Sequence, residues 1–351
     1  MSKLSGYFKK AAGKAGNLLN RISNVFDSED PIIILPYRGF ANEHQIYLKG
    51  RVLENEDIFQ GKTDSEIRNL VNSYKRFETD ELPNVKVEIR INEQRFEVVT
   101  DDEGYFILAT NWTPPTEKTT DNWISADLRL LGITNENNEP IEAEGAIYFP
   151  SKNAAYGIIS DVDDTVLQTH VTSRFKLKML YATFMQDASK RLPMEGMVKL
   201  FQAFAKGKDG KQDNPIFYVS HSPWNIYDLL EQFMDLQILP KGPILLRDYG
   251  IYASGAFKSH KIETIQLILK MYPTLPFLLF GDSAEKDADF YLTLAKEFPE
   301  QIKAIYIRKV KNNKNADRVA AMIDAHPNIN AILVETSEEM LAHARANGWL
   351  A

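Results

Sequence analysis

The segment from Ile158 to Leu167 constrains the fold of this chain more than any other. An apolar strand, Ile158-Ile-Ser, runs straight into Asp161, Asp163 and the hydroxyl of Thr165. A strand that ends in Asp-x-Asp fits the carboxyl edge of a parallel sheet, where open α/β sheets bind their ligands. The same residues could also form an acidic turn in a solvated loop, so the rest of the chain must distinguish the two interpretations.

From Gly157 onward, strand patterns alternate with helix patterns, which is typical of a doubly wound parallel sheet. The expected strands are 157–160, 215–219, 276–280, 303–307 and 331–334. An insertion at about 168–212 separates the first two strands and is predicted to form a helical cap over the ligand edge. Its apolar and basic residues suit an acyl chain with an anionic head, although such an apolar stripe is more often part of a core.

The two carboxylates after the first strand suit covalent phosphoryl transfer. Asp161 is ionised at neutral pH and can attack phosphorus to form an aspartyl-phosphate, which water then removes. Asp163 can protonate the leaving oxygen and deprotonate the water if its pKa is raised, as crowding among carboxylates tends to do. We therefore predict Asp161 as the nucleophile and Asp163 as the acid/base.

Later segments supply the other groups that such a site needs. Ser220 follows the second strand, where its hydroxyl and nearby backbone N–H groups could bind phosphoryl oxygens. Lys261 lies in the first turn of an amphipathic helix, from which its ammonium could neutralise both nucleophile and phosphate. Asp282 and Asp287 follow another apolar strand and offer the hard oxygen ligands that Mg²⁺ prefers. A serine after a strand or a lysine on a helix is a weak signal alone, because most helix lysines are solvated.

In order and spacing, these four motifs resemble those of the haloacid-dehalogenase-like phosphohydrolases. The resemblance narrows to the Asp-x-Asp-type phosphatidate phosphatase family, known from fungal actin patches and from bacterial relatives, and it covers roughly residues 140–351. The segments that carry it are 160–166, 218–228, 246–250, 281–287 and 304–308. Two departures are His221, where relatives usually have Asn or Ser, and Asp164, where other superfamily branches have Gly.

The resemblance implies Mg²⁺-dependent hydrolysis of phosphomonoesters, with conversion of phosphatidate to diacylglycerol and phosphate as the leading activity. The residues that it implies for catalysis are Asp161, Asp163 and Lys261. Those implied for phosphate binding are Thr165, Ser220, His221 and Lys261, and those for the metal are Asp161, Asp163, Asp282 and Asp287. Two alternatives stay open: a phosphatase of a soluble phosphomonoester or phosphoprotein, and a non-catalytic binding protein that uses its N-terminal domain.

Composition restricts the function classes further. The chain has 351 residues, of which 44% are hydrophobic, and this length suits two domains. The absence of cysteine excludes disulfides, thiolate zinc sites and cysteine nucleophiles. A net charge of −7 gives no support to nucleic-acid binding. No stretch approaches the roughly 20 apolar residues that span a bilayer.

Residues 1–28 are predicted to form a basic amphipathic helix. Residues 1–26 hold five basic residues and no acid, while apolar residues recur every three or four positions. The segment could lie on an anionic membrane surface, or it could dock on this chain or on a second subunit. A lipid substrate favours the membrane, so we expect a cytoplasmic protein that can bind peripherally to the inner face of the membrane.

Residues 29–150 are predicted to form an antiparallel β-sandwich, before a phosphatase domain at 151–351. Segments 45–53, 85–91 and 95–99 alternate or nearly alternate between apolar and polar residues, and 64–77 has the pattern of a helix. Gly104 permits a turn before one more strand. This domain either braces the catalytic domain or binds a protein partner, whose identity the sequence does not indicate.

Overall fold

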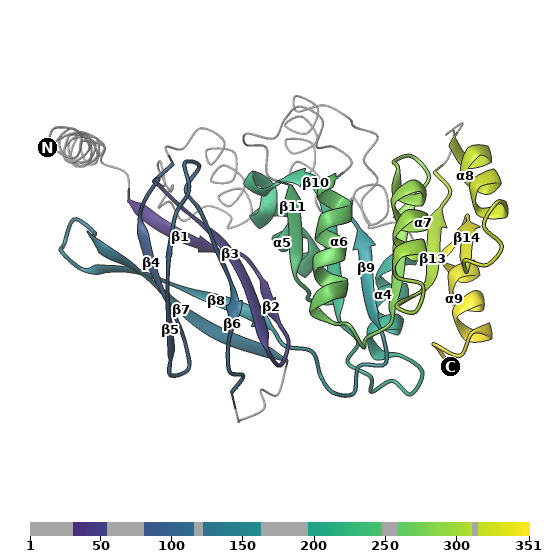
Figure 1. Ribbon diagram of the computed structural model, residues 1–351, viewed down its shortest axis with the longest axis horizontal. Coiled ribbons are helices and arrows are strands. Elements are labelled where there is room, and N and C mark those ends of the chain that lie inside the picture. The colour runs from purple at the N-terminus through teal and green to yellow at the C-terminus, as the bar shows by residue number, and fades with distance from the viewer. Residues whose placement is uncertain (1–30, 55–80, 116–121, 163–195, 248–258, 311–314) are drawn as a thin grey trace, which may run out of the picture.

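The computed structural model describes residues 31–54, 81–115, 122–162, 196–247, 259–310 and 315–351. An antiparallel sheet precedes a parallel sheet with its helices, which confirms the predicted mixed α/β content (Figure 1). The predicted helices at 1–28 and 64–77, and most of the predicted cap, lie outside the described residues. No helix within the described ranges is long and apolar enough to cross a bilayer.

The first sheet has eight strands in the order β1-β3-β2-β8-β7-β4-β5, with β6 paired to β3. Segments predicted as strands become β3, β4, β5 and β6, and the tight turn between β4 and β5 places Asn92 at φ 53°. The strands are β1 Ile32–Pro36, β2 Gly39–Ala41, β3 Gln45–Glu54, β4 Lys86–Ile91, β5 Gln94–Val99, β6 Tyr105–Asn111, β7 Trp123–Thr134 and β8 Pro140–Tyr148.

This sheet departs from a purely antiparallel sandwich at β2. That short strand pairs antiparallel with β3 on one side and parallel with β8 on the other. It therefore joins two halves of the sheet, one made of β1, β3 and β6 and the other of β8, β7, β4 and β5. Phe40, in the middle of β2, is fully buried. Apolar side chains from both halves share one core beneath the sheet.

The second sheet is parallel, with strand order β11-β10-β9-β12-β13-β14. Its strands are β9 Gly157–Asp161, β10 Ile216–Pro223, β11 Ile244–Arg247, β12 Phe277–Asp282, β13 Ile302–Arg308 and β14 Ala331–Val334. Five of them lie where the apolar runs predict strands. The strand β11 was missed; it has only three apolar residues before Arg247, although all four of its residues are buried.

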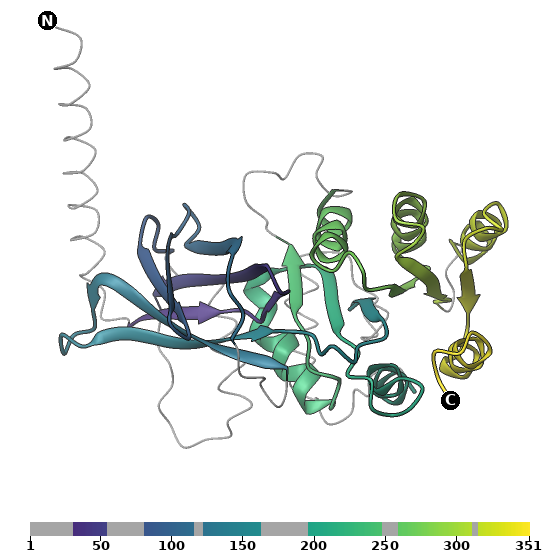
Figure 2. The same cartoon turned by 60° about the horizontal axis from the view of Figure 1, so that its bottom comes forward.

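Helices cover both faces of the parallel sheet (Figure 2). One face packs against α4 Met197–Lys206, α5 Tyr227–Leu236 and α9 Ser337–Ala346. The other packs against α6 Ser259–Met271, α7 Asp287–Glu297 and α8 Asn315–Asp324. The described end of the predicted cap, α4, buries Met197, Leu200, Phe201 and Phe204 against the sheet. That part of the insertion therefore belongs to the core.

The strand order locates the ligand crevice. The first strand of this sheet in the sequence, β9, lies in the middle; the chain then builds outward through β10 and β11 and returns to the other side with β12. Crevices in open α/β sheets form at such a reversal, outside the carboxyl ends of the strands. Asp161 ends β9 and Asp282 ends β12, so both carboxylates lie at this point.

The two sheets pack directly against each other. Tyr37 and Tyr105 from the antiparallel part join the core on one face of the parallel sheet, and Phe40 and Tyr148 join the core on the other. Arg38 adds ionic contacts across the same boundary: its Nε lies 2.7 Å from Glu231 and its Nη2 lies 3.0 Å from Asp235 on α5.

Arg38 is therefore expected to stabilise the whole described fold. In Arg38→Met, Glu231 loses the cation that offsets its burial, which by itself raises the pKa of that carboxyl. Breaking a fully buried pair costs about 3–5 kcal/mol. Since the Glu231 and Asp235 side chains are 33% and 55% exposed, we expect a loss of about 2 kcal/mol, measured by urea unfolding at neutral pH.

The matched control is Lys206→Met, which removes an ion pair with Asp213 whose side chains are 63% and 42% exposed. Exposed pairs contribute little, so this variant should unfold close to the wild-type midpoint. Equal destabilisation by the two substitutions would contradict the role given to Arg38.

Candidate active site

A buried ion pair forms the centre of the site. Asp161 and Lys261 are both fully buried, and the Lys261 ammonium donates a hydrogen bond to Asp161 Oδ1 at 2.8 Å. Lys261 is the third residue of α6, and this helix packs against the sheet face that holds Asp161. The general expectation that a helix lysine is solvated is therefore wrong here.

Asp287 completes this ion pair from a third segment. It is the first residue of α7, is fully buried, and accepts a hydrogen bond from Lys261 through Oδ1. Its Oδ2 accepts one from the backbone N–H of Asp282 at 3.2 Å. A Cβ atom at Gly281 would lie 2.5 Å from Asp287 Oδ2, so only glycine allows this close approach.

The loop between β12 and α7 brings in a carboxylate that the sequence analysis did not assign. Asp282 Oδ1 accepts hydrogen bonds from the backbone N–H groups of Ala284 at 2.5 Å and Glu285 at 2.9 Å. This turn places Glu285 Oε2 3.7 Å from the Lys261 ammonium. The available signal was the acid at Glu285 itself, three residues after an aspartate that favours such turns.

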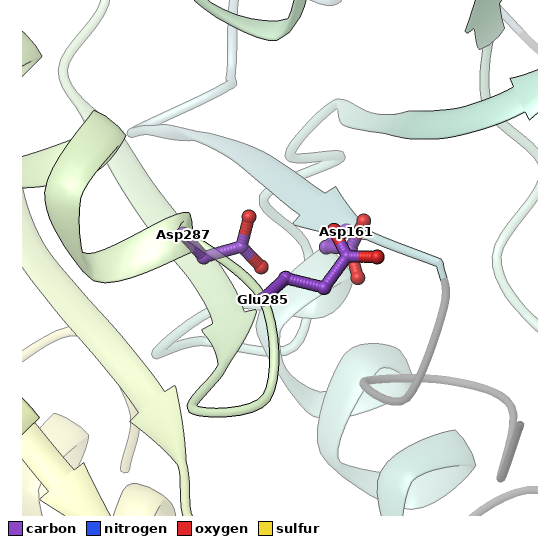
Figure 3. Close-up of side chains that lie close together, drawn as sticks. All are labelled: Asp161, Glu285 and Asp287. Carbon is purple, nitrogen blue, oxygen red and sulfur yellow. The ribbon is translucent and has the colours of Figure 1, made fainter. Parts of the chain in front are cut away.

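Asp161, Glu285 and Asp287 form a group that could bind a metal ion. One carboxylate oxygen from each lies within 4.8 Å of the others. Figure 3 shows the three side chains gathered at the end of β9, with Asp287 at the start of α7 and Glu285 on the loop before it. Oxygen ligands of this kind suit Mg²⁺ or Ca²⁺.

The charges in this group also favour a cation. Burial, followed by the charge of Asp287, raises the pKa of Asp282 to about 8. Burial also raises the pKa of Asp287, although Lys261 opposes the shift. Burial alone would lower the pKa of Lys261, but Asp161 and Asp287 outweigh it and raise that pKa well above its usual value. One ammonium thus faces several carboxylates, and a metal would relieve the excess negative charge.

Ser220 and His221 lie on β10 beside this group. Val219 pairs with Asp161, so Ser220 follows directly after the register partner of the predicted nucleophile. Ser220 is fully buried, and its Oγ accepts a hydrogen bond from the backbone N–H of Ser222 at 2.9 Å. His221 Nδ1 lies 3.3 Å from Glu285 Oε2. Hydrogen bonding to His221 and the charge of Lys261 outweigh burial and lower the pKa of Glu285.

The structure thus brings together most of the residues that the sequence singled out. Asp161, Lys261 and Asp287 are in contact, with Ser220 and His221 on the neighbouring strand. Asp282 was expected to bind the metal, but it is not in the closest carboxylate group: its Oδ1 holds the turn, while its Oδ2 is buried without a hydrogen-bond partner among the described residues. Asp163 and Thr165 lie outside the described residues.

The raised pKa of Asp282 predicts a pH dependence of the metal-free protein. The folded state holds a proton on Asp282 between the ordinary value of 3.8 and about 8, whereas the unfolded state does not. This contribution to stability is complete below about pH 4 and is lost as the pH rises through about 8. In EDTA, the unfolding midpoint should therefore fall between about pH 5.5 and about pH 8.5.

Asp282→Asn, which cannot ionise, should flatten this fall. Asp289→Asn is the control, because Asp289 lies on the same helix as Asp287 but its side chain is 38% exposed and faces Arg318. Identical slopes in wild type and Asp282→Asn would show that Asp282 does not hold the proton.

Comparisons with known proteins point to one family. A family model described as phosphatidate phosphatase APP1, catalytic domain, matches residues 156–309. Phosphatidate phosphatase APP1 of Saccharomyces cerevisiae is 37% identical over 161 residues, which are 45% of this chain and 26% of the yeast protein. An uncharacterized protein of Schizosaccharomyces pombe is 27% identical over 222 residues, which are 62% of this chain and 35% of that protein.

The chain thus spans only 26% and 35% of these two curated relatives. Among solved structures, a carbohydrate acetylesterase from Xanthomonas citri aligns with a TM-score of 0.27 and 9% identity, over 83% of this chain and 72% of that one. Similarity at this level supports no conclusion about fold or function. The matched range 156–309, in contrast, contains every described residue of the site.

Proposed function

Because residues 156–309 match the family model described as phosphatidate phosphatase APP1, catalytic domain, and are similar to the yeast enzyme of that name, we propose that this protein hydrolyses phosphatidate to diacylglycerol and phosphate. The observation that carries the proposal is the buried Asp161–Lys261–Asp287 group at the carboxyl end of β9. It places the carboxylate of Asp161 at the reversal of strand order, where open α/β sheets bind their ligands.

The chemistry follows from these side chains. Asp161 attacks phosphorus, so that a bond from its carboxylate oxygen forms while the bond to the lipid oxygen breaks. Asp163 gives a proton to the departing diacylglycerol oxygen, takes one from the attacking water, and phosphate leaves Asp161. Lys261 donates a hydrogen bond to Asp161 and is proposed to offset charge on the phosphoryl oxygens. Ser220, His221 and Thr165 are proposed to bind those oxygens.

Mg²⁺ is the proposed cofactor. Asp161, Glu285 and Asp287 would hold it, together with Asp163 and Asp282, and the surplus of carboxylates over ammonium groups fits a divalent cation. When bound, Mg²⁺ supplies positive charge to the transferring phosphoryl group. The donors are all oxygens, as this hard cation requires.

We also propose that the catalytic part is haloacid-dehalogenase-like. Its motifs end β9, lie within β10, begin α6 and follow β12, and the helices on both faces support a doubly wound sheet. The boundaries at 28/29 and 150/151 are part of the same proposal. Residues 1–28 would then be a basic segment that holds a cytoplasmic enzyme on the inner face of an anionic membrane.

A substrate comparison tests the proposed function. Phosphate release from phosphatidate in mixed micelles should exceed that from a panel of soluble phosphomonoesters and phosphopeptides. It should require Mg²⁺, stop in excess EDTA, and not be restored by Ca²⁺, which tolerates looser geometry. A vesicle assay without residues 1–26 tests the membrane segment separately. Preference for a soluble ester would show that the protein is a phosphatase of soluble phosphomonoesters or phosphoproteins. No hydrolysis of any substrate would favour a non-catalytic binding protein.

Asp161→Asn tests the covalent mechanism. It keeps the size of the side chain and an oxygen for Lys261, but it removes the attacking charge, so kcat should fall by about 10³-fold or more. Asp163→Asn should lower kcat by about 10²–10⁴-fold through loss of the acid/base. The control Asp213→Asn changes a carboxylate that pairs only at the surface with Lys206. Near-normal turnover by folded Asp161→Asn would rule out the aspartyl-phosphate.

A further inference from the structure

We propose that the antiparallel sheet positions the phosphate-binding residues of the active site, through Tyr37 and Lys49. The antiparallel sheet would then help to set the geometry of the catalytic site. This inference rests on the proposed function only for the role of Ser220 and His221 as phosphate-binding residues. We call residues 220–223, the irregular last part of β10, the serine loop, and residues 224–226 the tryptophan turn.

The serine loop is irregular where it passes the site. Between β10 and β11, Val219 pairs with Leu245 and Pro223 pairs with Arg247, so the register shifts across residues 220–222. Irregularities of this kind re-aim side chains and interrupt the ladder that would otherwise fix them. The positions of Ser220 and His221 therefore depend on what holds the chain just after them.

That next segment is held from the antiparallel sheet. The ring of Tyr37, between β1 and β2, stacks on Trp224 at 4.5 Å and 19°, and it also packs on Tyr227 at 4.4 Å. The ammonium of Lys49, on β3, lies 4.9 Å from the Trp224 ring. Trp224, Tyr37 and Lys49 are all buried, and cation–π attraction is strongest when the groups are desolvated.

Further contacts fix the segment that follows the tryptophan turn. The backbone N–H of Arg38 donates to the Tyr227 hydroxyl at 2.7 Å, and the Arg38 side chain pairs with Glu231 and Asp235 along α5. Tyr105 Oη, on β6, lies 3.5 Å from Asn225 Oδ1. The tryptophan turn therefore contacts side chains from three parts of the antiparallel sheet: Tyr37 between β1 and β2, Lys49 on β3 and Tyr105 on β6.

The position of Trp224 affects the site because only a few residues separate Trp224 from His221. Trp224 follows Pro223 directly, and His221, three residues before Trp224, lies 3.3 Å from Glu285. Release of Trp224 would let the serine loop move away from Asp161 and Glu285. Misplacement of a binding group by about 1 Å can cost about 10²-fold in rate. The described contacts of Tyr37 and Lys49 are with aromatic rings such as that of Trp224 and not with the reacting groups, so we treat both as positioning residues.

The test compares two cations that contact aromatic rings at the same boundary. Lys49→Met removes the charge near Trp224. Lys241→Met removes a cation that lies 4.4 Å from the Trp123 ring, in a part of the boundary that holds no residue of the site. Tyr37→Leu and Tyr37→Phe are made in parallel, because the second keeps the stacked ring. All variants use the full chain.

Two readouts are measured with Mg²⁺ present. Calorimetry gives the Kd of orthovanadate, a phosphate analogue, and turnover gives kcat and KM for the preferred substrate; the thermal midpoint monitors folding. We expect Lys49→Met and Tyr37→Leu to raise the vanadate Kd and the KM by about tenfold or more. Tyr37→Phe and Lys241→Met should stay within about twofold of wild type.

The outcomes separate this inference from the proposed function. If wild type binds vanadate but hydrolyses no phosphatidate, the proposed function fails. The vanadate Kd values of the variants still test whether Tyr37 and Lys49 position the phosphate-binding residues. Equal effects of Lys49→Met and Lys241→Met would overturn the positioning role, and Lys49→Met keeps the test valid if Tyr37→Leu does not fold. A wild-type protein that binds no vanadate would overturn both.

Discussion

The burial of Lys261 is the constraint on which the rest of the site depends. An ammonium removed from water costs several kcal/mol unless carboxylates surround it, and removing one partner leaves an uncompensated buried charge. Asp161 and Asp287 supply those carboxylates from the end of β9 and the start of α7. Three segments that are distant in sequence therefore fix one another. Because the carboxylates of Asp161, Glu285 and Asp287 outnumber the single ammonium, the group could also bind a metal cation.

Much of the parallel sheet could be predicted, because buried strands in such sheets are short apolar runs and their carboxyl ends collect polar residues. The limits of this signal are visible in two short strands: β11 has only three apolar residues before Arg247, and β2 has only three residues in all. The strand β7 was also not predicted, although its sequence carries the signal. Its residues alternate between buried and exposed from Ile124 to Leu130, as expected for a strand with one buried face.

The site was predictable in its residues but less so in its geometry. The ends of the apolar runs placed Asp161, Ser220 and Asp282 at one edge of the sheet, although β10 continues past Ser220 to Pro223. The depth of Lys261 could not be read from the sequence, because an amphipathic helix offers the same first-turn position to solvent or to a core. Glu285 was missed because its position depends on how the Asp282 side chain folds the loop, and that same bond diverts Asp282 from the closest carboxylate group.

The family match and the structural unit do not coincide. The matched range begins at residue 156, whereas Tyr37, Phe40, Tyr105 and Tyr148 complete the cores of the parallel sheet from outside that range. A core shared in this way cannot be divided without exposing aromatic rings to water, at about 25 cal/mol per Å² of apolar surface. This packing favours the interpretation of the antiparallel part as a brace over that of a partner-binding module. A module that only recruited a partner would need no such continuity, because its work would be done on its outer surface.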